Sequence, residues 1–503
     1  MVRRTKRQRS SSGSGITQQP WSQVCNPYPP LEILSADQIE AIHQASLTLL
    51  EKVGLRICSD EARGILASAG AEVDEAEQRV RFDPALVIES VAKAPSSFTL
   101  RARNPLHDIS FGGNRILFSS IGGPAYCSDL LRGRRSGSYQ DMCDYMRLVQ
   151  SLNIIHQEGG SPFEPMDLPA ESRHLDIYLA QARFLDKNSQ CYPLGRERTR
   201  DAIEMACITL QCSREELAER PAVMGIINTN SPLLFDTPMA EAVIELAQAN
   251  QVSCVTPFTL AGAMSPVTLA GTLAQMNAEV LAVITLTQVI RPGAPVIYGS
   301  FSSNVDMKSG SPAFGTPEYA KCVQASTQLA RHYQLPVRSS NTTASNVVDP
   351  QSTYESMMSL WSCITGHVNL VNHAAGWLEG GLTASFEKLI VDAEMLQMLS
   401  SYLQEIEVNE DTLALSTIAE VGPSGHFFGT AHTLERYETA FYQPMLSDWR
   451  NYETWQEGGE VNAAQRACDI WQQLLRDYQQ PPLDAAIDEA LVSYVARRKE
   501  SIA

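Results

Sequence analysis

Residues 222–262 hold two short apolar runs on either side of a helical segment: AVMGIINTN (222–230), PMAEAVIELAQAN (238–250) and SCVTPFTLAG (253–262). Short apolar runs of this length are typical of buried β-strands, whereas the middle segment has apolar residues at helical spacing. A strand, a helix and a second strand with no hairpin between them predict parallel strands joined by a crossover helix. This stretch therefore predicts an α/β fold.

The same unit recurs along the chain. Eight runs of this kind alternate with helical segments: ILFSSIGG (116–123), NIIHQEGG (153–160), SQCYPLG (189–195), AVMGIINTN (222–230), SCVTPFTLAG (253–262), PVIYGSFSS (295–303), PVRSSNT (336–342) and VNLVNHAAG (368–376). Eight strand–helix units over about 260 residues fit a closed (β/α)8 TIM barrel. The alternative is a doubly wound open sheet, but no GxGxxG follows the first strand.

Four regions follow from this pattern. Residues 1–20 are predicted to be a disordered basic tail, 21–112 an N-terminal α+β region, 113–405 the barrel, and 406–503 a C-terminal loop and helices packed on the barrel. A helix is expected near Asp37, because Ser35 and Gln38 form a capping pair before an apolar helical pattern.

Composition excludes several classes of protein. The chain has 503 residues and a net charge of -18, although its first nine residues include five arginines and lysines, so a broad basic face for nucleic acid is not expected. No apolar segment follows these arginines and no long uncharged apolar run is evident, which argues against secretion and a membrane span and favours the cytoplasm. The 11 cysteines are scattered without the spacing of a zinc site, and no metal site is predicted.

Functional side chains of such a barrel lie at the carboxyl ends of the strands. At these positions the sequence has aromatic and amide residues that we predict to bind substrate, with one phenylalanine added from the loop GPSGHFFGTAHT (422–433): Tyr192, Asn228, Phe258, Tyr298, Phe301, Asn341 and Phe427. Aromatic rings with little nearby charge suit a quaternary ammonium, which is held by cation–π attraction. For any single ring, ordinary packing is the competing interpretation.

Six long motifs resemble the trimethylamine methyltransferase family. The resemblance covers residues from about 30 to about 460 and rests on GGPAYCSDLLRGRR (122–135), NTNSPLLFD (228–236), PFTLAGAMSPVTLAG (257–271), YGSFSSNVDMKSGSPAFGTPEY (298–319), NHAAGWLEGGLTASFEKLIVD (372–392) and GPSGHFFGTAHTLERY (422–437). The resemblance implies a barrel enzyme that demethylates methylated amines and passes the methyl group to a corrinoid protein. It also implies a homo-oligomer.

One departure from the family pattern affects the expected substrate. Trimethylamine-specific members carry a pyrrolysine in the region similar to SSNTTASNVVDPQSTYES (339–356), where this chain has standard residues only, near 345–351. The chain therefore resembles the non-pyrrolysine branch, which includes glycine betaine methyltransferases. The expected reaction moves a methyl group from glycine betaine or a related betaine to the Co(I) of a corrinoid (cobalamin) that a partner protein supplies.

The resemblance also implies roles for residues at the carboxyl ends of the barrel strands. His373 is expected to contact the corrinoid or the substrate, and four glycines with one asparagine are expected to line the corrinoid opening: Gly122, Gly123, Gly159, Asn372 and Gly376. A betaine carboxylate would need a donor such as Arg196, Asn228 or Asn341. Two alternatives remain open, namely a sulfonium substrate such as dimethylsulfoniopropionate and a barrel that binds a quaternary amine without turnover.

Overall fold

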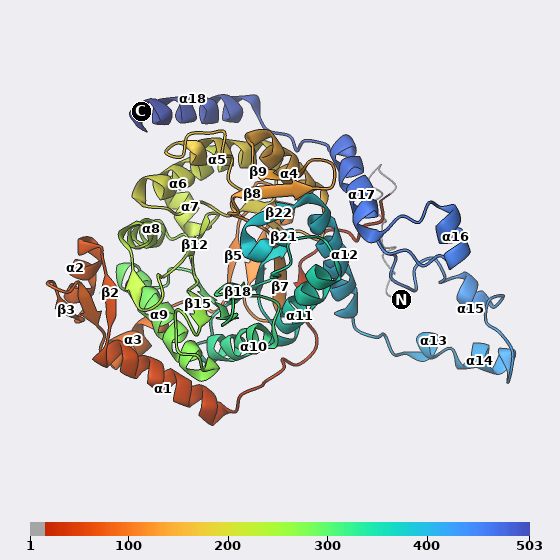
Figure 1. The fold of residues 1–503 in the computed structure, drawn as a ribbon, viewed down its shortest axis with the longest axis horizontal. Helices are drawn as coiled ribbons and strands as arrows, with labels where there is room; N and C mark the ends of the chain where they lie inside the picture. The colour runs from red at the N-terminus through yellow and green to blue at the C-terminus, as the bar shows by residue number, and fades with distance from the viewer. Residues whose placement is uncertain (1–15, 503) are drawn as a thin grey trace.

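A computed structural model describes residues 16–502 and contains the eight predicted strands in one parallel sheet (Figure 1). In chain order these are β7 (Arg115–Ser120), β10 (Gln157–Glu158), β11 (Asn188–Ser189), β12 (Met224–Ile227), β14 (Val252–Val255), β16 (Val296–Gly299), β19 (Val337–Ser340) and β20 (Leu370–Ala375). β20 pairs with β7, and a parallel bridge between Cys191 and Gly225 joins the two ends of the sheet. The sheet is therefore a closed barrel, as predicted.

Helices surround this barrel on its outside (Figure 1). They are α4 (Tyr139–Ser151), α5 (Arg173–Phe184), α6 (Arg196–Leu210), α7 (Arg214–Glu219), α8 (Thr237–Gln248), α9 (Leu269–Ile290), α10 (Pro317–His332), α11 (Pro350–Gly366) and α12 (Phe386–Tyr402). Several begin with a side-chain cap, such as the box that Asp349 and Ser352 form at the start of α11. The alternation of strand and capped helix confirms the (β/α)8 architecture.

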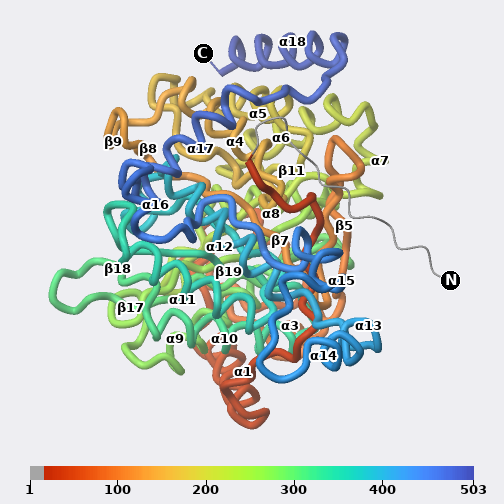
Figure 2. The backbone as a smooth tube through the Cα atoms, turned by 90° about the vertical axis from the view of Figure 1, so that its right-hand side faces the viewer, coloured from red at the N-terminus to blue at the C-terminus, as the bar shows by residue number. Residues whose placement is uncertain are grey.

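Two small sheets extend the barrel beyond the carboxyl ends of its strands. One contains β15 (Phe258–Ala261), β17 (Phe301–Val305) and β18 (Pro312–Ala313), and the other contains β8 (Tyr126–Asp129), β9 (Gly133–Ser136), β21 (Trp377–Leu378) and β22 (Thr383–Ser385). Figure 2 shows β17, β18, β8 and β9 on one side of the molecule and β5 on the other. The runs 253–262 and 295–303 are thus each two strands, because the backbone breaks after β14 and β16 before continuing as β15 and β17.

The N-terminal region packs against one side and the amino end of the barrel. It consists of α1 (Ala36–Lys52), β2 (Leu55–Ile57), α2 (Asp60–Ser68), β3 (Glu72–Asp74), β4 (Arg79–Arg81), α3 (Pro84–Val91), β5 (Phe98–Leu100) and β6 (Ile109–Phe111). The barrel contributes β13 (Leu234–Phe235) to this region's sheet. The β5–β6 hairpin buries Phe111 against inward residues of the strands, including Ile297 and Leu370, and so closes the barrel with an apolar layer.

Helix α9 is long and apolar enough to cross a membrane by length and composition, with 83% of the tested window buried in the chain. Its neighbours in the fold are α1, α2, α3, α8 and α10, which cover it with protein. Its Asn277 donates to the hydroxyl of Ser46 on α1 at 2.9 Å. These contacts are typical of a core helix of a globular protein.

The two ends of the chain depart from the prediction. Residues 16–20 do not form a free tail, because the Gln18 amide donates to the Ser151 carbonyl and the Gln19 backbone donates to Gln397 on α12. β1 (Val24–Cys25) then pairs with β7. Residues 1–15 of the predicted tail lie outside the described residues.

At the other end of the chain, only part of the C-terminal region packs on the barrel. α17 (Ala463–Asp477) lies on α12 and α4, and α18 (Ala485–Ile502) lies on α5 and α6. Residues 406–457, here called the extension, lie to one side of the barrel with short helices: α13 (Glu410–Leu413), α14 (Leu415–Val421), α15 (Ala431–Leu434) and α16 (Tyr452–Glu457) (Figure 1). The extension contacts the barrel where the backbone N–H groups of Met445 and Leu446 donate to Glu394 of α12. The prediction that the whole region packs on the barrel is therefore wrong for most of the extension.

Candidate active site

A bulge in β20 brings two consecutive side chains to the same side of the strand. The register between β20 and β7 shifts between Val371 and Ala375, and His373 has a φ of 51°. In an unbroken strand Asn372 and His373 would point to opposite faces. Here the Asn372 amide oxygen accepts from Gln190, which directly follows β11, at 2.9 Å, while His373 Nδ1 lies 3.2 Å from the Ser340 hydroxyl of β19. Both side chains therefore reach into the barrel.

His373 is surrounded by aromatic rings at the carboxyl end of the barrel. Its ring centroid lies 4.7 Å from that of Trp377 and 6.0 Å from that of Phe301. Burial, followed by the charge of Arg338, holds the pKa of His373 well below its ordinary value. The imidazole is therefore neutral at neutral pH and serves as a polar contact without adding positive charge.

Four rings form one continuous cluster, here called the aromatic wall: Phe258, Phe301, Phe314 and Trp377. Phe258 and Phe301 are register partners on the parallel strands β15 and β17, so their centroids are 5.2 Å apart. Phe314 and Trp377 are buried behind them, while Phe258 and Phe301 keep part of their surface exposed. The wall therefore presents ring surface at the open end of the barrel.

The loop after β19 holds this wall in place. Trp377 Nε1 donates to the Thr343 carbonyl at 3.0 Å, and the Glu355 carboxylate accepts from the Ala344 backbone at 2.9 Å. Trp377 is also supported from below, because the Gly376 backbone N–H donates to Asp392 at 2.8 Å.

Deeper in the barrel, amide side chains form a hydrogen-bonded layer. The Gln190 amide nitrogen lies within 3.1 Å of acceptors on Ser119, Gln157 and Asn372, which come from β7, β10 and β20. Such a connected network satisfies its polar groups and fixes the side chains of four strands relative to one another.

Arg338 of β19 lies beside this layer and differs from it. Its side chain is buried, and its Nε and Nη1 atoms have no hydrogen-bond partner in the described chain. The guanidinium carbon lies 5.1 Å from the Phe301 ring centroid. Burial lowers the pKa of Arg338, because the charged form loses its hydration.

Sequence reasoning found part of this site and missed part of it. Phe258, Phe301, Asn372 and His373 are brought together as expected, and Asn228 follows β12 as an exposed residue at the same end. Phe314, Trp377 and Arg338 were not among the predicted residues. Arg338 had a usable signal, because a charged residue in the middle of a buried parallel strand is unusual.

Tyr298 does not belong to the site. It lies on β16 between Ile297, which faces the apolar layer, and Gly299, so the alternation of strand side chains turns the tyrosine outward. Its hydroxyl donates to Asn277 of α9 at 2.8 Å, and the ring stacks on Tyr333. The prediction that it binds substrate is corrected by this geometry.

Three other predicted or candidate residues are occupied by contacts within the chain. Asn341 is fully buried and donates to the Ala374 carbonyl at 2.9 Å. The Tyr192 ring lies 5.5 Å from the guanidinium carbon of Arg198, so a cation already faces it. Arg196, a candidate carboxylate donor, is paired with carboxylates of the N-terminal region and α8, namely Glu61 and Glu245.

Phe427 is placed far from the wall. It lies in the extension, between α14 and α15, and is 44% exposed. Figure 1 shows these two helices to the side of the barrel and away from its axis. The prediction that Phe427 joins the barrel-end aromatics is therefore wrong, because the loop that carries it does not fold back over the barrel.

Most of the glycines expected to open the site are required for packing instead. A Cβ on Gly122 would lie 2.0 Å from the Gly159 carbonyl oxygen, so these residues allow two strand ends to approach each other. A Cβ on Gly376 would lie 1.9 Å from the Tyr145 hydroxyl. Gly123 alone of the four has open space beside it. Of the four glycines that were expected to line a corrinoid opening, only Gly123 is therefore free of close backbone or side-chain neighbours.

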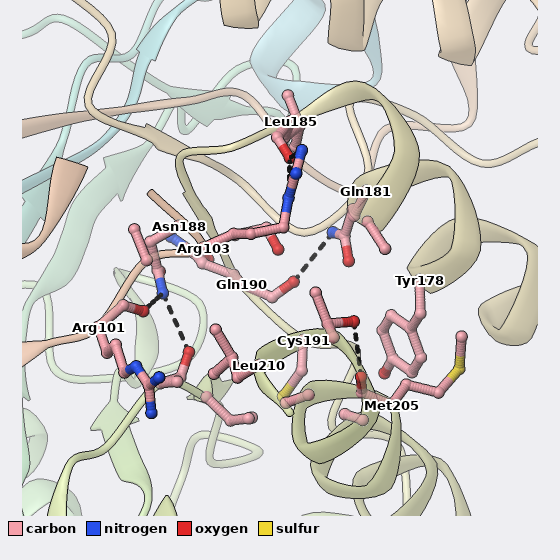
Figure 3. Close-up of a pocket in the computed structure, with 18 of the residues that line it drawn as sticks. Arg101, Arg103, Tyr178, Gln181, Leu185, Asn188, Gln190, Cys191, Met205 and Leu210 are labelled. Atoms are coloured by element: carbon pink, nitrogen blue, oxygen red, sulfur yellow. Dashed lines mark hydrogen bonds between the residues drawn. The ribbon is translucent and has the colours of Figure 1, made fainter. Parts of the chain in front are cut away.

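A cavity of about 100 Å³ lies between α5, α6 and β11, beside the barrel (Figure 3). The polar groups that line it bind one another: Asn188 donates to the Arg101 carbonyl, Gln181 to the Gln190 carbonyl and Arg103 to the Leu185 carbonyl. These three side chains are engaged within the chain and no residue of the aromatic wall lines the cavity, so we do not assign it to the active site. Across residues 16–502, no group of three or more histidine, cysteine, aspartate or glutamate side chains could hold a metal ion.

The fold and site define a class: a (β/α)8 barrel whose open end carries an uncharged aromatic wall, a neutral histidine and a buried arginine. The chain belongs to the trimethylamine methyltransferase (MttB) family, whose model matches residues 1–503.

Relatives of known name extend over almost the whole chain. The chain is 37% identical over 475 residues to the glycine betaine methyltransferase of Desulfitobacterium hafniense strain Y51, covering 94% of this chain and 98% of that one. It is 30% identical over 471 residues to the trimethylamine methyltransferase MttB of Desulfitobacterium hafniense strain DSM 10664 / DCB-2, covering 93% and 94%.

Among solved structures, the monomethylamine methyltransferase MtmB of Methanosarcina barkeri is similar with a TM-score of 0.45 and 10% identity, covering 88% of this chain and 93% of that one.

Proposed function

We propose that this protein transfers a methyl group from a quaternary amine, glycine betaine or a related betaine, to the Co(I) of a corrinoid that a partner protein carries. The observation that carries the proposal is the aromatic wall at the open end of the barrel, next to a histidine that stays neutral. A quaternary nitrogen offers no hydrogen bond, so ring faces are its natural binding partners. The likeness to a glycine betaine methyltransferase supports the same substrate class.

The reaction requires little acid–base catalysis from the protein. A corrinoid, when bound, supplies a Co(I) nucleophile strong enough to accept the methyl group. The leaving group is a neutral tertiary amine that keeps the electron pair of the broken N–CH3 bond, so no proton has to be delivered. The protein's own contribution is to orient one N–CH3 bond towards the open end of the barrel and to exclude water around it.

The residues at the open end are compatible with a large planar cofactor. Phe258, Phe301 and His373 are partly exposed there, Asn228 is exposed, and Gly123 has open space beside it. The amino end of the barrel is closed by the apolar β5–β6 layer, so a corrinoid would approach from the opposite end. His373 and Asn228 are our candidates for contacts with it. The homo-oligomer and the cytoplasmic location remain predictions.

The proposal is tested by following the absorbance of reduced Co(I) cobalamin with the purified protein and one methyl donor at a time. The donors are glycine betaine, proline betaine, carnitine, trimethylamine and dimethylsulfoniopropionate. We expect conversion with a betaine, with the demethylated product confirmed by mass spectrometry. Conversion with the sulfonium alone would replace the substrate class, and binding of a betaine without conversion would favour a non-catalytic barrel.

A further inference from the structure

Arg338 is a buried cation for which the described part of the chain supplies no countercharge. Its side chain is 2% exposed, and within residues 16–502 it forms no ion pair, while Nε and Nη1 have no hydrogen bond. Placing an unpaired ion in a protein interior costs several kcal/mol, so such a group is retained only where something else compensates it. Other buried cations of this chain are satisfied: Lys388 pairs with Asp392, and Lys187 donates to three carbonyl groups.

The titratable groups that act on the pKa of Arg338 do not supply a negative charge. The groups that raise its pKa are Cys254, Tyr319 and Cys363, and no carboxylate is among them. Burial raises the pKa of Cys254 to about 11 and that of Cys363 to about 12, and it also raises the pKa of Tyr319. All three are therefore neutral at neutral pH, so none of them balances the charge of the guanidinium.

Arg338 lies deeper in the barrel than the aromatic wall, on the side of the amino end. Arg338 is the register partner of Leu370, which belongs to the apolar layer that closes the amino end. It precedes Ser340, the neighbour of His373, by two residues, which is a rise of about 7 Å along the strand. A ligand that entered from the open end would meet the aromatic wall first and Arg338 behind it, with Phe301 touching both.

An arginine directly behind a site for a cation would repel a ligand that was only a cation. A ligand with a quaternary nitrogen and a carboxylate a few bonds apart removes the conflict, because each end meets the opposite charge or a ring face.

We infer that Arg338 binds the carboxylate of a zwitterionic methyl donor and holds its quaternary centre against the aromatic wall. This inference rests on the proposed function for its reaction, but it concerns binding alone. It assigns the site to carboxylate-bearing onium compounds, both ammonium and sulfonium. Donors without a carboxylate, such as trimethylamine, choline and tetramethylammonium, leave Arg338 unpaired and are disfavoured. A methyl group opposite the carboxylate then faces the open end of the barrel.

The test is isothermal titration calorimetry of the full chain without corrinoid. The ligands are glycine betaine, dimethylsulfoniopropionate and tetramethylammonium, and the proteins are wild type, Arg338→Met and Arg338→Lys. Hydrogen bonds to a charged group contribute about 1.5–3 kcal/mol. We therefore expect Arg338→Met to bind both carboxylate ligands about 10- to 100-fold more weakly. Arg338→Lys keeps the charge but not the planar pair of donors, so its loss should be smaller.

Tetramethylammonium separates a lost contact from a damaged fold. We expect Arg338→Met to bind this ligand as well as wild type or better, because a repulsive charge has been removed. Phe301→Leu should weaken the binding of all three ligands. Unchanged binding of glycine betaine and of the sulfonium by Arg338→Met would overturn the inference, as would a wild type that prefers tetramethylammonium. Arg338-dependent binding without methyl transfer would uphold this inference while the proposed function failed.

Discussion

Aromatic residues occur in two regions of this molecule in opposite environments. In the aromatic wall, Phe314 is 2% exposed and Trp377 5%, and each ring contacts others of the wall. In the extension, Phe428 is 84% exposed and Phe441 78%. Aromatic residues therefore indicate a binding site only where several rings converge on one point. Aromatic content alone does not distinguish the wall from the extension, because both regions are rich in aromatic residues.

The backbone explains this difference. The wall is carried by β15 and β17, parallel strands in register that continue from the barrel. The extension consists of helices of four to seven residues. Helices this short gain little stability by themselves, so their side chains cannot be held in a fixed cluster without packing from elsewhere.

The largest expected effect is on the buried ion pair beneath the wall. Lys388→Met leaves the Asp392 carboxylate buried without its cation, which should lower the free energy of unfolding by about 3–5 kcal/mol. Asp392 also accepts from the Gly376 N–H, so the support of Trp377 is weakened as well. Urea unfolding followed by circular dichroism measures the loss.

The matched control lies in the extension. Arg436→Met removes an ion pair with Asp411 that is exposed to solvent, and we expect no measurable change of the urea midpoint. Equal losses for Lys388→Met and Arg436→Met would show that ion pairs in the two regions contribute alike to stability. That result would contradict the contrast between a tightly packed barrel end and a loosely packed extension.

Acid should act on the barrel through a buried histidine. His156 Nδ1 accepts from the Phe118 backbone, its Nε2 bonds the Ser22 carbonyl, and burial lowers its pKa to about 4. Because the unfolded state takes up the proton at a higher pH, this stability is complete above about pH 6.5 and falls as the pH drops to 4. The total loss is about 3 kcal/mol.

Urea midpoints between pH 7.5 and pH 4 measure this effect in wild type and in His156→Gln. We expect the variant to start lower at pH 7.5 and to lose less on acidification. His426→Gln, in an exposed position of the extension, is the control and should follow wild type. A variant with the wild-type slope would assign the acid sensitivity to other groups.

The barrel itself could be predicted from the sequence because its signal is local and repeated. Each of the eight runs overlaps one barrel strand, and several of the helices between them begin with a side-chain cap. The division of 253–262 and 295–303 into two strands each could not be predicted, because both halves of each run are apolar. Which residues faced inward was also hidden, as Tyr298 and Phe301 show, since a single break in the strand changes the direction of every later side chain.

The site could be predicted only in part, for a related reason. His373 and Asn372 are adjacent in sequence, and a regular strand would have separated them; the bulge that unites them has no signature in this sequence. Trp377 lies on β21 and Phe314 directly follows β18, and the two small sheets that contain these strands are completed by distant pairings, β15 with β17 and β22 with β8, which no local pattern specifies. Convergence of this kind is a tertiary property.

A smaller effect should distinguish the two groups of rings by function. Phe301→Leu keeps most of the apolar volume but removes the ring face, and a desolvated cation–π contact is worth about 2 kcal/mol. We therefore expect kcat/KM for the betaine substrate to fall about 30-fold. Steady-state methyl transfer to cobalamin provides the measurement, with circular dichroism to verify the fold.

The same change in the extension, Phe428→Leu, should leave kcat/KM within about twofold of wild type, as expected for a surface substitution. If Phe428→Leu lost as much activity as Phe301→Leu, the extension would belong to the active site.

The smallest expected effect concerns the stability and activity of the extension itself. Phe428→Ser combined with Phe441→Ser replaces two exposed rings, so the free energy of unfolding should change by no more than about 0.5 kcal/mol and methyl transfer should persist.

The mass of the protein in solution should change instead in the double variant. Soluble monomers rarely expose so many large apolar side chains in one segment, and a homo-oligomer is the predicted state. Light scattering should give a wild-type mass that is a multiple of the 55.3 kDa chain and a lower mass for the double variant. An unchanged mass together with lost activity would mean that these rings act on the barrel end after all, and the contrast between the two aromatic regions would fail.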